Sequence, residues 1–212
     1  MVTDASRWHE ETVSDAVRAT IRDISDRALL ANCYLAGGTA LALRFGHRRS
    51  VDLDFFSEQG VNPDDLIQGL LGLERLTVVA KDSGTLHVAV RDVKLSFLTY
   101  RYPVLFALEN FRGVPVADPR DIACMKLTAI ASRGTKRDFI DLYQAAQRLG
   151  GMKAIFGWFS RKYAAANYSR PHLLKSLTFF ADAEQDPNPD MLIPWNWAAV
   201  KRYFATEAPQ LL

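Results

Sequence analysis

Two aspartates, Asp52 and Asp54, stand two residues apart in the segment "SVDLDFF". In an extended strand alternate side chains share a face, so we expect both carboxylates to project from one face and the apolar residues between and after them to enter a core. Neighbouring like charges repel unless a cation neutralises them. The spacing therefore favours Mg²⁺ or Mn²⁺ bound by this pair. Two alternatives stay open: acids solvated at a strand end, or acids paired with Arg48 and Arg49.

A glycine pair, Gly37 and Gly38, lies upstream in "YLAGGTALAL", where a short apolar run meets a short helix. Free N–H groups at a helix N-terminus attract phosphate oxygens, and glycine lets those oxygens come close. Thr39 adds a hydroxyl and is expected to cap the helix. Mg²⁺ prefers a few carboxylates together with substrate phosphates. The glycine turn and the two aspartates together predict a nucleoside-triphosphate site.

A third cluster of charged residues occupies "KLTAIASRGTKRDFIDLY", in which Lys126, Arg133 and Lys136 bracket Asp138 and Asp141. Cations placed across a cleft from the glycine turn would hold phosphates and stabilise the charge that develops as pyrophosphate leaves. Asp138 would orient Lys126 or accept the proton of an attacking hydroxyl. The alternative is a set of exposed ion pairs three or four residues apart along a helix.

These motifs carry a family resemblance. "GGTALAL…HRRSVDLDFF" resembles the glycine-glycine and DxD signature of DNA polymerase β-like nucleotidyltransferases, and "DIACMKLTAIASRGTKRDFIDLY" is similar to the second block of the AbiEii/AbiGii toxin family. The resemblance implies an Mg²⁺-dependent nucleotidyltransferase of a toxin–antitoxin or phage-defence system, with RNA (tRNA among the candidates) or protein as acceptor and a cognate antitoxin. It also implies that a lysine and an aspartate of the second block are catalytic, which we carry over to Lys126 and Asp138. The expected nucleotide-binding residues are Gly37, Gly38, Thr39, Arg48, Arg49, Ser50, Arg133, Lys136 and Asp141.

The sequence departs from the family pattern at the third carboxylate, which such enzymes carry on a later strand. In "VKLSFLTY" the corresponding position is Ser96, and Asp92 lies only at the start of the segment. One metal instead of two, or Asp138 as a substitute acid, would preserve catalysis. Otherwise the chain is a nucleotide-binding or interaction module without turnover. A haloacid-dehalogenase-like phosphatase is the third alternative, but "HRRSV" replaces the apolar strand that such a site requires.

The positioning elements follow from periodicity and turn residues. We expect an α+β domain over residues 1–117, with a nucleotidyltransferase-like mixed sheet, and an all-helical domain over 118–212 that completes the cleft. Apolar residues at helical spacing predict one amphipathic helix over 6–31. Further helices are expected at 40–45, 62–72, 119–132, 136–149, 152–166, 171–182 and 195–205, and strands at 33–37, 50–57, 76–81, 86–91 and 93–100.

Composition narrows the class of protein. The chain has 212 residues, 49% of them hydrophobic, and two cysteines that supply neither a disulfide framework nor a zinc set. No segment has the length of a membrane span, so we expect a cytoplasmic protein without a membrane partner. Residues 118–170 carry ten lysines and arginines against four acids, a local charge of +6. This excess suits a polyanionic partner, although a solvated helix surface explains it equally well.

Overall fold

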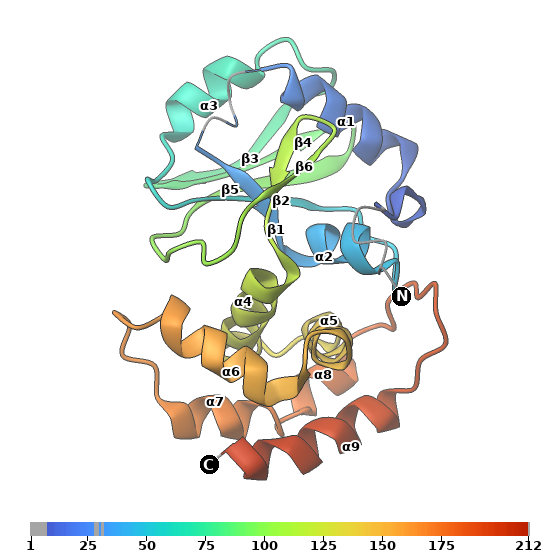
Figure 1. The fold of residues 1–212 in the computed structure, drawn as a ribbon. Helices are drawn as coiled ribbons and strands as arrows, with labels where there is room; N and C mark the ends of the chain where they lie inside the picture. The colour runs from blue at the N-terminus through green and yellow to red at the C-terminus, as the bar shows by residue number, and fades with distance from the viewer. Residues whose placement is uncertain (1–7, 28–29, 31, 212) are drawn as a thin grey trace. The chain divides into compact units, whose positions relative to one another are not determined.

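The computed structural model describes residues 8–27, 30 and 32–211. The chain forms two compact units (Figure 1). Unit 1 comprises residues Met1–Tyr102 and Ala107–Ala117, and unit 2 comprises Pro103–Phe106 and Asp118–Leu212. None of the helices in the described part of the chain combines the length and the hydropathy that crossing a bilayer requires.

Unit 1 is built on a mixed seven-stranded sheet in the order β3-β4-β5-β2-β1-β7-β6. Strand β1 pairs antiparallel with β2 and parallel with β7, and β2 pairs parallel with β5. The remaining neighbours are antiparallel. The strands are β1 (Tyr34–Ala36), β2 (Leu53–Ser57), β3 (Thr77–Asp82), β4 (Thr85–Val90), β5 (Val93–Thr99), β6 (Glu109–Phe111) and β7 (Val114–Val116).

The two faces of this sheet differ in chemistry. Apolar side chains of β2, β4 and β5 enter the core on the side that carries α1 (Asp15–Ser25) and α3 (Pro63–Leu70) (Figure 1). Leu53, Phe55 and Phe97 on this side are fully buried, and the last two rings stack 5.1 Å apart. The intervening side chains point to the opposite face and keep partial exposure. Strand β5 shows the alternation typical of a half-buried strand, with Val93, Leu95 and Phe97 buried.

The predicted N-terminal helix over 6–31 is wrong in its extent. A short 3-10 helix, η1 (Glu10–Thr12), comes first, and α1 then begins after Ser14, whose hydroxyl accepts a hydrogen bond from the Val17 amide. Serine satisfies one of the free N–H groups of the first turn, which fixes the start of the helix there. Residues 6–7, 28–29 and 31 of that prediction lie outside the described residues.

Unit 2 is helical, which confirms the expected change from strands to helices. Its first helices match the predicted boundaries closely. The helices are α4 (Pro119–Ser132), α5 (Lys136–Arg148), α6 (Gly151–Lys162), α7 (Arg170–Ser176), α8 (Ala181–Gln185) and α9 (Trp197–Glu207), followed by a 3-10 turn, η3 (Ala208–Leu211). The single helix expected over 171–182 is instead two helices, broken between Ser176 and Ala181.

Two short strands, β6 and β7, were not predicted. They form a hairpin around Arg112 and Gly113, whose φ angles are 51° and 86°. Positive φ at both central residues is typical of the tight turns that join antiparallel strands. Three-residue strands with Pro115 inside the second carry almost no alternation, so the sequence gives little signal for them. They complete the seven-stranded mixed sheet.

Candidate functional site

The glycine turn of unit 1 lies directly against one of the two aspartates. Ala36 at the end of β1 is paired with Asp54 on β2, and the chain turns into α2 (Gly37–Phe45) at the next residue. Gly37 has a φ of +70°, and a Cβ added there would lie 3.0 Å from Asp54 Oδ2. Glycine is required here both for the left-handed backbone and for the approach of the carboxylate. The turn and the acid pair therefore form one constellation.

The prediction that Thr39 caps α2 is wrong. The helix begins at Gly37, its N-cap residue is Ala36, and no side chain caps it. Thr39 lies inside the first turn, almost fully buried, where its hydroxyl is 2.8 Å from Ser50 Oγ and donates a short hydrogen bond to the Asp52 carbonyl. Thr39 and Ser50 therefore fix the backbone just before β2. Ala36 offers no side-chain acceptor to the N–H groups of the first turn of α2.

The two acids sit at the entrance of β2, which begins at Leu53 and not at the predicted residue 50. Asp52 precedes the strand and Asp54 belongs to it, and both are half-buried. Among the described residues no three His, Cys, Asp or Glu side chains are grouped as a metal site. Two carboxylates suit Mg²⁺, which commonly takes one or two protein carboxylates and completes its octahedron with phosphate oxygens and water.

Ser96 is the direct neighbour of Asp54 in the sheet. The parallel pairing of β2 with β5 puts these two residues in register, on the partly exposed face. The antiparallel pairing of β5 with β4 puts His87 in register with Ser96, and its Nδ1 lies 3.1 Å from Ser96 Oγ. In the sequence alone, His87 has no partner at metal-ligand spacing. The usable signal is the hairpin turn at 91–92, which sets positions 87 and 96 opposite each other.

Arg48 and Arg49 differ in exposure. The Arg48 side chain is buried and its guanidinium donates a hydrogen bond of 3.0 Å to the Arg49 carbonyl oxygen. Arg49 itself is exposed. Of the two, Arg49 has the accessibility that contact with a diffusing polyanion requires.

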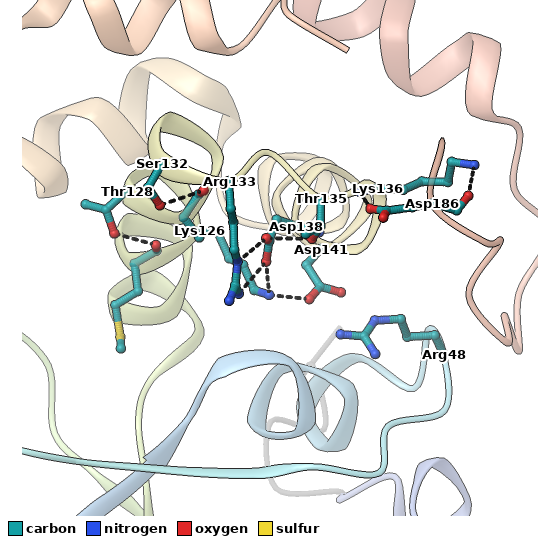
Figure 2. Close-up of polar contacts among 12 residues, drawn as sticks. Arg48, Lys126, Thr128, Ser132, Arg133, Thr135, Lys136, Asp138, Asp141 and Asp186 are labelled. Carbon is teal, nitrogen blue, oxygen red and sulfur yellow. Dashed lines mark hydrogen bonds and ion pairs between the residues drawn. The ribbon is translucent and has the colours of Figure 1, made fainter. Parts of the chain in front are cut away.

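In unit 2, Lys126 joins two aspartates of the next helix. Its ammonium lies 2.8 Å from Asp138 Oδ1 and 2.7 Å from Asp141 Oδ2 (Figure 2). All three side chains are at most 7% exposed. The charges are therefore paired within the helical unit, and the alternative of solvated ion pairs along one helix is wrong for these residues.

Asp138 receives additional donors. Arg133 Nε lies 3.1 Å from Asp138 Oδ2, and Thr135 Oγ1 donates to the same oxygen at 2.6 Å (Figure 2). Burial alone raises the pKa of this carboxyl, but attraction by Lys126 and Arg133 outweighs burial and lowers the pKa to about 2. The ionised form is thus favoured in the fold. Its pairing stabilises the protein above the ordinary carboxyl pKa, and that contribution is lost as the pH falls towards 2.

Thr135 is the N-cap of α5 as well as a donor to Asp138, since its hydroxyl accepts a hydrogen bond from the Asp138 amide. We expect Thr135→Val to lower the free energy of unfolding by about 1–2 kcal/mol, because the cap and the donor are lost while the side-chain volume is kept. Urea titration measures this change. The matched control is Ser132→Ala, whose hydroxyl only donates back to Ala129 in the last turn of α4. Equal effects of the two substitutions would contradict the capping role.

Lys136 lies elsewhere. Its ammonium donates to the Asp186 carbonyl oxygen at 2.6 Å, and its amide donates to Asp186 Oδ2 at 2.8 Å (Figure 2). The ammonium also donates to Asn188 Oδ1 at 3.3 Å. These contacts tie the start of α5 to the segment after α8. The structure thus brings Lys126, Arg133, Asp138 and Asp141 together and leaves Lys136 outside that group.

A second buried ion pair in unit 2 was not predicted. Lys162 on α6 lies 2.7 Å from Asp121 on α4, and both are almost completely buried. Lys162 also donates to the Pro103 carbonyl, while Asp121 accepts from the amides of Leu105 and Phe106. The pair holds the segment 103–106 onto the helices. The two residues lie 41 positions apart in the sequence, so no local pattern reveals them.

Most of the chain matches a known protein family. Residues 19–210 match the family model described as nucleotidyl transferase AbiEii toxin, type IV TA system. An uncharacterised protein of Aquifex aeolicus is 34% identical over 200 residues, which cover 92% of this chain and 95% of that protein.

Two solved structures share the fold at 19% sequence identity. MenT4, a nucleotidyltransferase toxin of Mycobacterium tuberculosis, aligns with a TM-score of 0.57 over 96% of this chain and 87% of that one. JHP933 of Helicobacter pylori aligns with a TM-score of 0.55 over 96% and 90%. The mixed sheet with a helical C-terminal half is therefore a nucleotidyltransferase-like fold. On the family match and the A. aeolicus relative, this chain belongs to the AbiEii nucleotidyl transferase toxin family.

Proposed function

We propose that the protein transfers a nucleoside monophosphate from a nucleoside triphosphate to an acceptor hydroxyl, with release of pyrophosphate. The observation that carries this proposal is the contact of Gly37 with the Asp54 carboxylate at the uncapped N-terminus of α2. Phosphate-binding N–H groups and a carboxylate pair are adjacent there, which is the pairing that a metal-bound triphosphate requires.

Asp52 and Asp54 are the residues that would hold Mg²⁺ or Mn²⁺. The bound ion would neutralise the triphosphate and orient it for in-line displacement. The remaining contributions come from the chain itself: the amides of Gly37, Gly38 and Thr39 bind phosphate oxygens, and Thr39 holds the Asp52 carbonyl in place. Arg49 supplies an exposed cation next to Ser50, whose hydroxyl is bound to Thr39.

A further contribution that we propose comes from Lys126. Lys126 binds a phosphate of the nucleotide through its ammonium. Asp138 and Asp141 position that ammonium, since their carboxylate oxygens lie 2.8 and 2.7 Å from Lys126 Nζ. A carboxyl whose pKa is about 2 accepts protons poorly at neutral pH, so we assign Asp138 to positioning and not to proton transfer. Arg133, 65% exposed, is the accessible cation of this group. Lys136 is assigned to the support of α5.

The acceptor that we propose is RNA, with tRNA among the candidates, and the biological role is that of a toxin with a cognate antitoxin. Two facts support this choice. Residues 118–170 carry a local charge of +6, which suits a polyanion, and the family is that of type IV toxins. A structural relative, MenT4, is itself described as a nucleotidyltransferase toxin.

The test is incubation with each labelled triphosphate, Mg²⁺ and either total RNA or total protein. We expect label in the RNA fraction, reduced about 100-fold by Asp52→Asn because one of the two metal-holding carboxylates is lost. Asp65→Asn, which changes an exposed acid in the first turn of α3, is the matched control. Label that survives in Asp52→Asn would refute the assignment of Asp52, and label in the protein fraction alone would refute the RNA acceptor.

The second candidate is a nucleotide-binding module without turnover. Ser96 favours it, since a hydroxyl stands beside Asp54 where the family pattern has a third carboxylate. Under this alternative the wild type transfers no label, and Ser96→Asp creates activity.

A further inference from the structure

Three residues from three neighbouring strands form a row on the partly exposed face of the sheet. Asp54 on β2 is in register with Ser96 on β5, and Ser96 is in register with His87 on β4. In-register neighbours on one face have Cβ atoms about 5 Å apart. The row therefore leads from the proposed metal-binding carboxylate to an imidazole, with one hydroxyl between them.

The hydroxyl and the imidazole are joined. Ser96 Oγ lies 3.1 Å from His87 Nδ1, and both side chains keep partial exposure to solvent. A serine hydroxyl cannot carry negative charge at neutral pH, but it can accept one proton while it donates its own. An imidazole accepts a proton within the physiological pH range. Together they can do what a single carboxylate does at this position.

The residues next to His87 on this face of the sheet do not compete with it for the Ser96 proton. Ala80 of β3 is in register with His87 on its other side, and Ala89 follows on the same face of β4. The charged groups that share the face are Asp82 on β3, Lys94 on β5 and Asp54 beyond Ser96. Asp82 and Lys94 are exposed, so their effects on His87 are screened by water.

We propose that Ser96 and His87 form a proton relay that replaces the third carboxylate in this chain. This inference rests on the proposed nucleotidyl transfer. The acceptor hydroxyl gives its proton to Ser96 Oγ while the Ser96 proton passes to His87 Nδ1. The acceptor oxygen forms its bond to the α-phosphorus, and the bond from that phosphorus to the bridging oxygen breaks, so that pyrophosphate leaves with the electron pair. Ser96 touches the acceptor, and His87 acts through it.

The relay predicts a specific pH profile. Transfer by the wild type should fall on the acid side, because a protonated imidazole cannot take up the Ser96 proton. His87→Asn keeps a hydrogen-bond acceptor near the Nδ1 position but does not titrate. We expect it to lower kcat about 100-fold, with little change in KM for the triphosphate, and to remove this acid limb.

Ser96→Asp supplies the carboxylate that the family pattern has. In the double variant Ser96→Asp with His87→Asn, we expect kcat to return to within about tenfold of the wild type, since a carboxylate at position 96 needs no imidazole behind it. His172→Asn is the matched control, because His172 is an exposed histidine of unit 2 whose ring forms a hydrogen bond with the Ala131 carbonyl oxygen. If His87 had only a structural role, His87→Asn would leave the acid limb of the pH profile unchanged.

The outcomes separate the two proposals. Asp54-dependent transfer with an unchanged pH profile in His87→Asn would overturn the relay alone, as would a double variant that stays as slow as His87→Asn. No Asp54-dependent transfer by the wild type would overturn the proposed function and the relay with it. Loss of the acid limb in His87→Asn and recovery in the double variant are the results that support the relay.

Discussion

Asp54→Asn is expected to reduce nucleotidyl transfer by at least about 1,000-fold, the largest effect on activity that the structure predicts. Asp54 is the carboxylate that lies against Gly37, so the substitution removes a charge at the point where the triphosphate and its metal would meet the backbone. Asparagine keeps the shape of the side chain. The free energy of unfolding should therefore change by no more than about 1 kcal/mol.

Single-turnover transfer of label to RNA, measured with and without excess Mg²⁺, gives the size of this effect. Asp92→Asn is the matched control: Asp92 is an exposed acid at the start of β5, paired with Arg75, and its φ of 67° is one that asparagine tolerates. It also tests whether Asp92 could supply the missing acid. A loss of transfer in Asp92→Asn equal to that in Asp54→Asn would contradict our assignment.

The sequence predicted those parts of the fold in which local signals are strong. Pro119 at the start of α4 and Thr135 as the cap of α5 mark helix starts that the structure reproduces to the residue. Alternating apolar residues likewise identified β4 and β5. The acids of the DxD segment and the glycine turn could be expected to meet because only one short helix separates them.

Other features depend on pairings that no local pattern records. Thr39 was expected to cap a helix, but its hydroxyl is bound to Ser50 and to the backbone of Asp52, eleven and thirteen residues away. Lys136 was expected to bind nucleotide, but its ammonium is bound to the segment after α8. A sequence does not show whether a threonine or a lysine side chain faces solvent or an interior partner, so neither outcome could be read from it.

The most consequential of these pairings is determined by the register of the sheet. The sequence identified Ser96 as the position of the missing acid, but it offered no partner for it. The β4–β5 hairpin supplies His87, and the parallel pairing of β2 with β5 supplies Asp54. A histidine that is isolated along the chain is thus the second neighbour of a candidate catalytic acid across the sheet.

The two buried lysines of unit 2 allow a structural and a catalytic role to be separated. Lys126→Met removes the ammonium that Asp138 and Asp141 share, and Lys162→Met removes the ammonium that pairs with Asp121. Each should lower the free energy of unfolding by about 3–5 kcal/mol. Lys162 holds the segment 103–106 through its contacts with Asp121 and the Pro103 carbonyl oxygen. These contacts involve none of the residues that surround Lys126. Urea titrations at neutral pH measure both losses.

Transfer assayed where both variants remain folded, as judged by far-UV circular dichroism, then distinguishes the two lysines. We expect Lys162→Met to keep activity within about threefold of the wild type and Lys126→Met to lose at least about 100-fold, because only Lys126 is proposed to bind a phosphate. Should Lys126→Met not fold, Lys126→Arg keeps the charge while changing its geometry and should still lower kcat. Equal activity of folded Lys126→Met and Lys162→Met would assign both lysines to the support of the helices, and the phosphate contact would have to come from Arg133 or from unit 1.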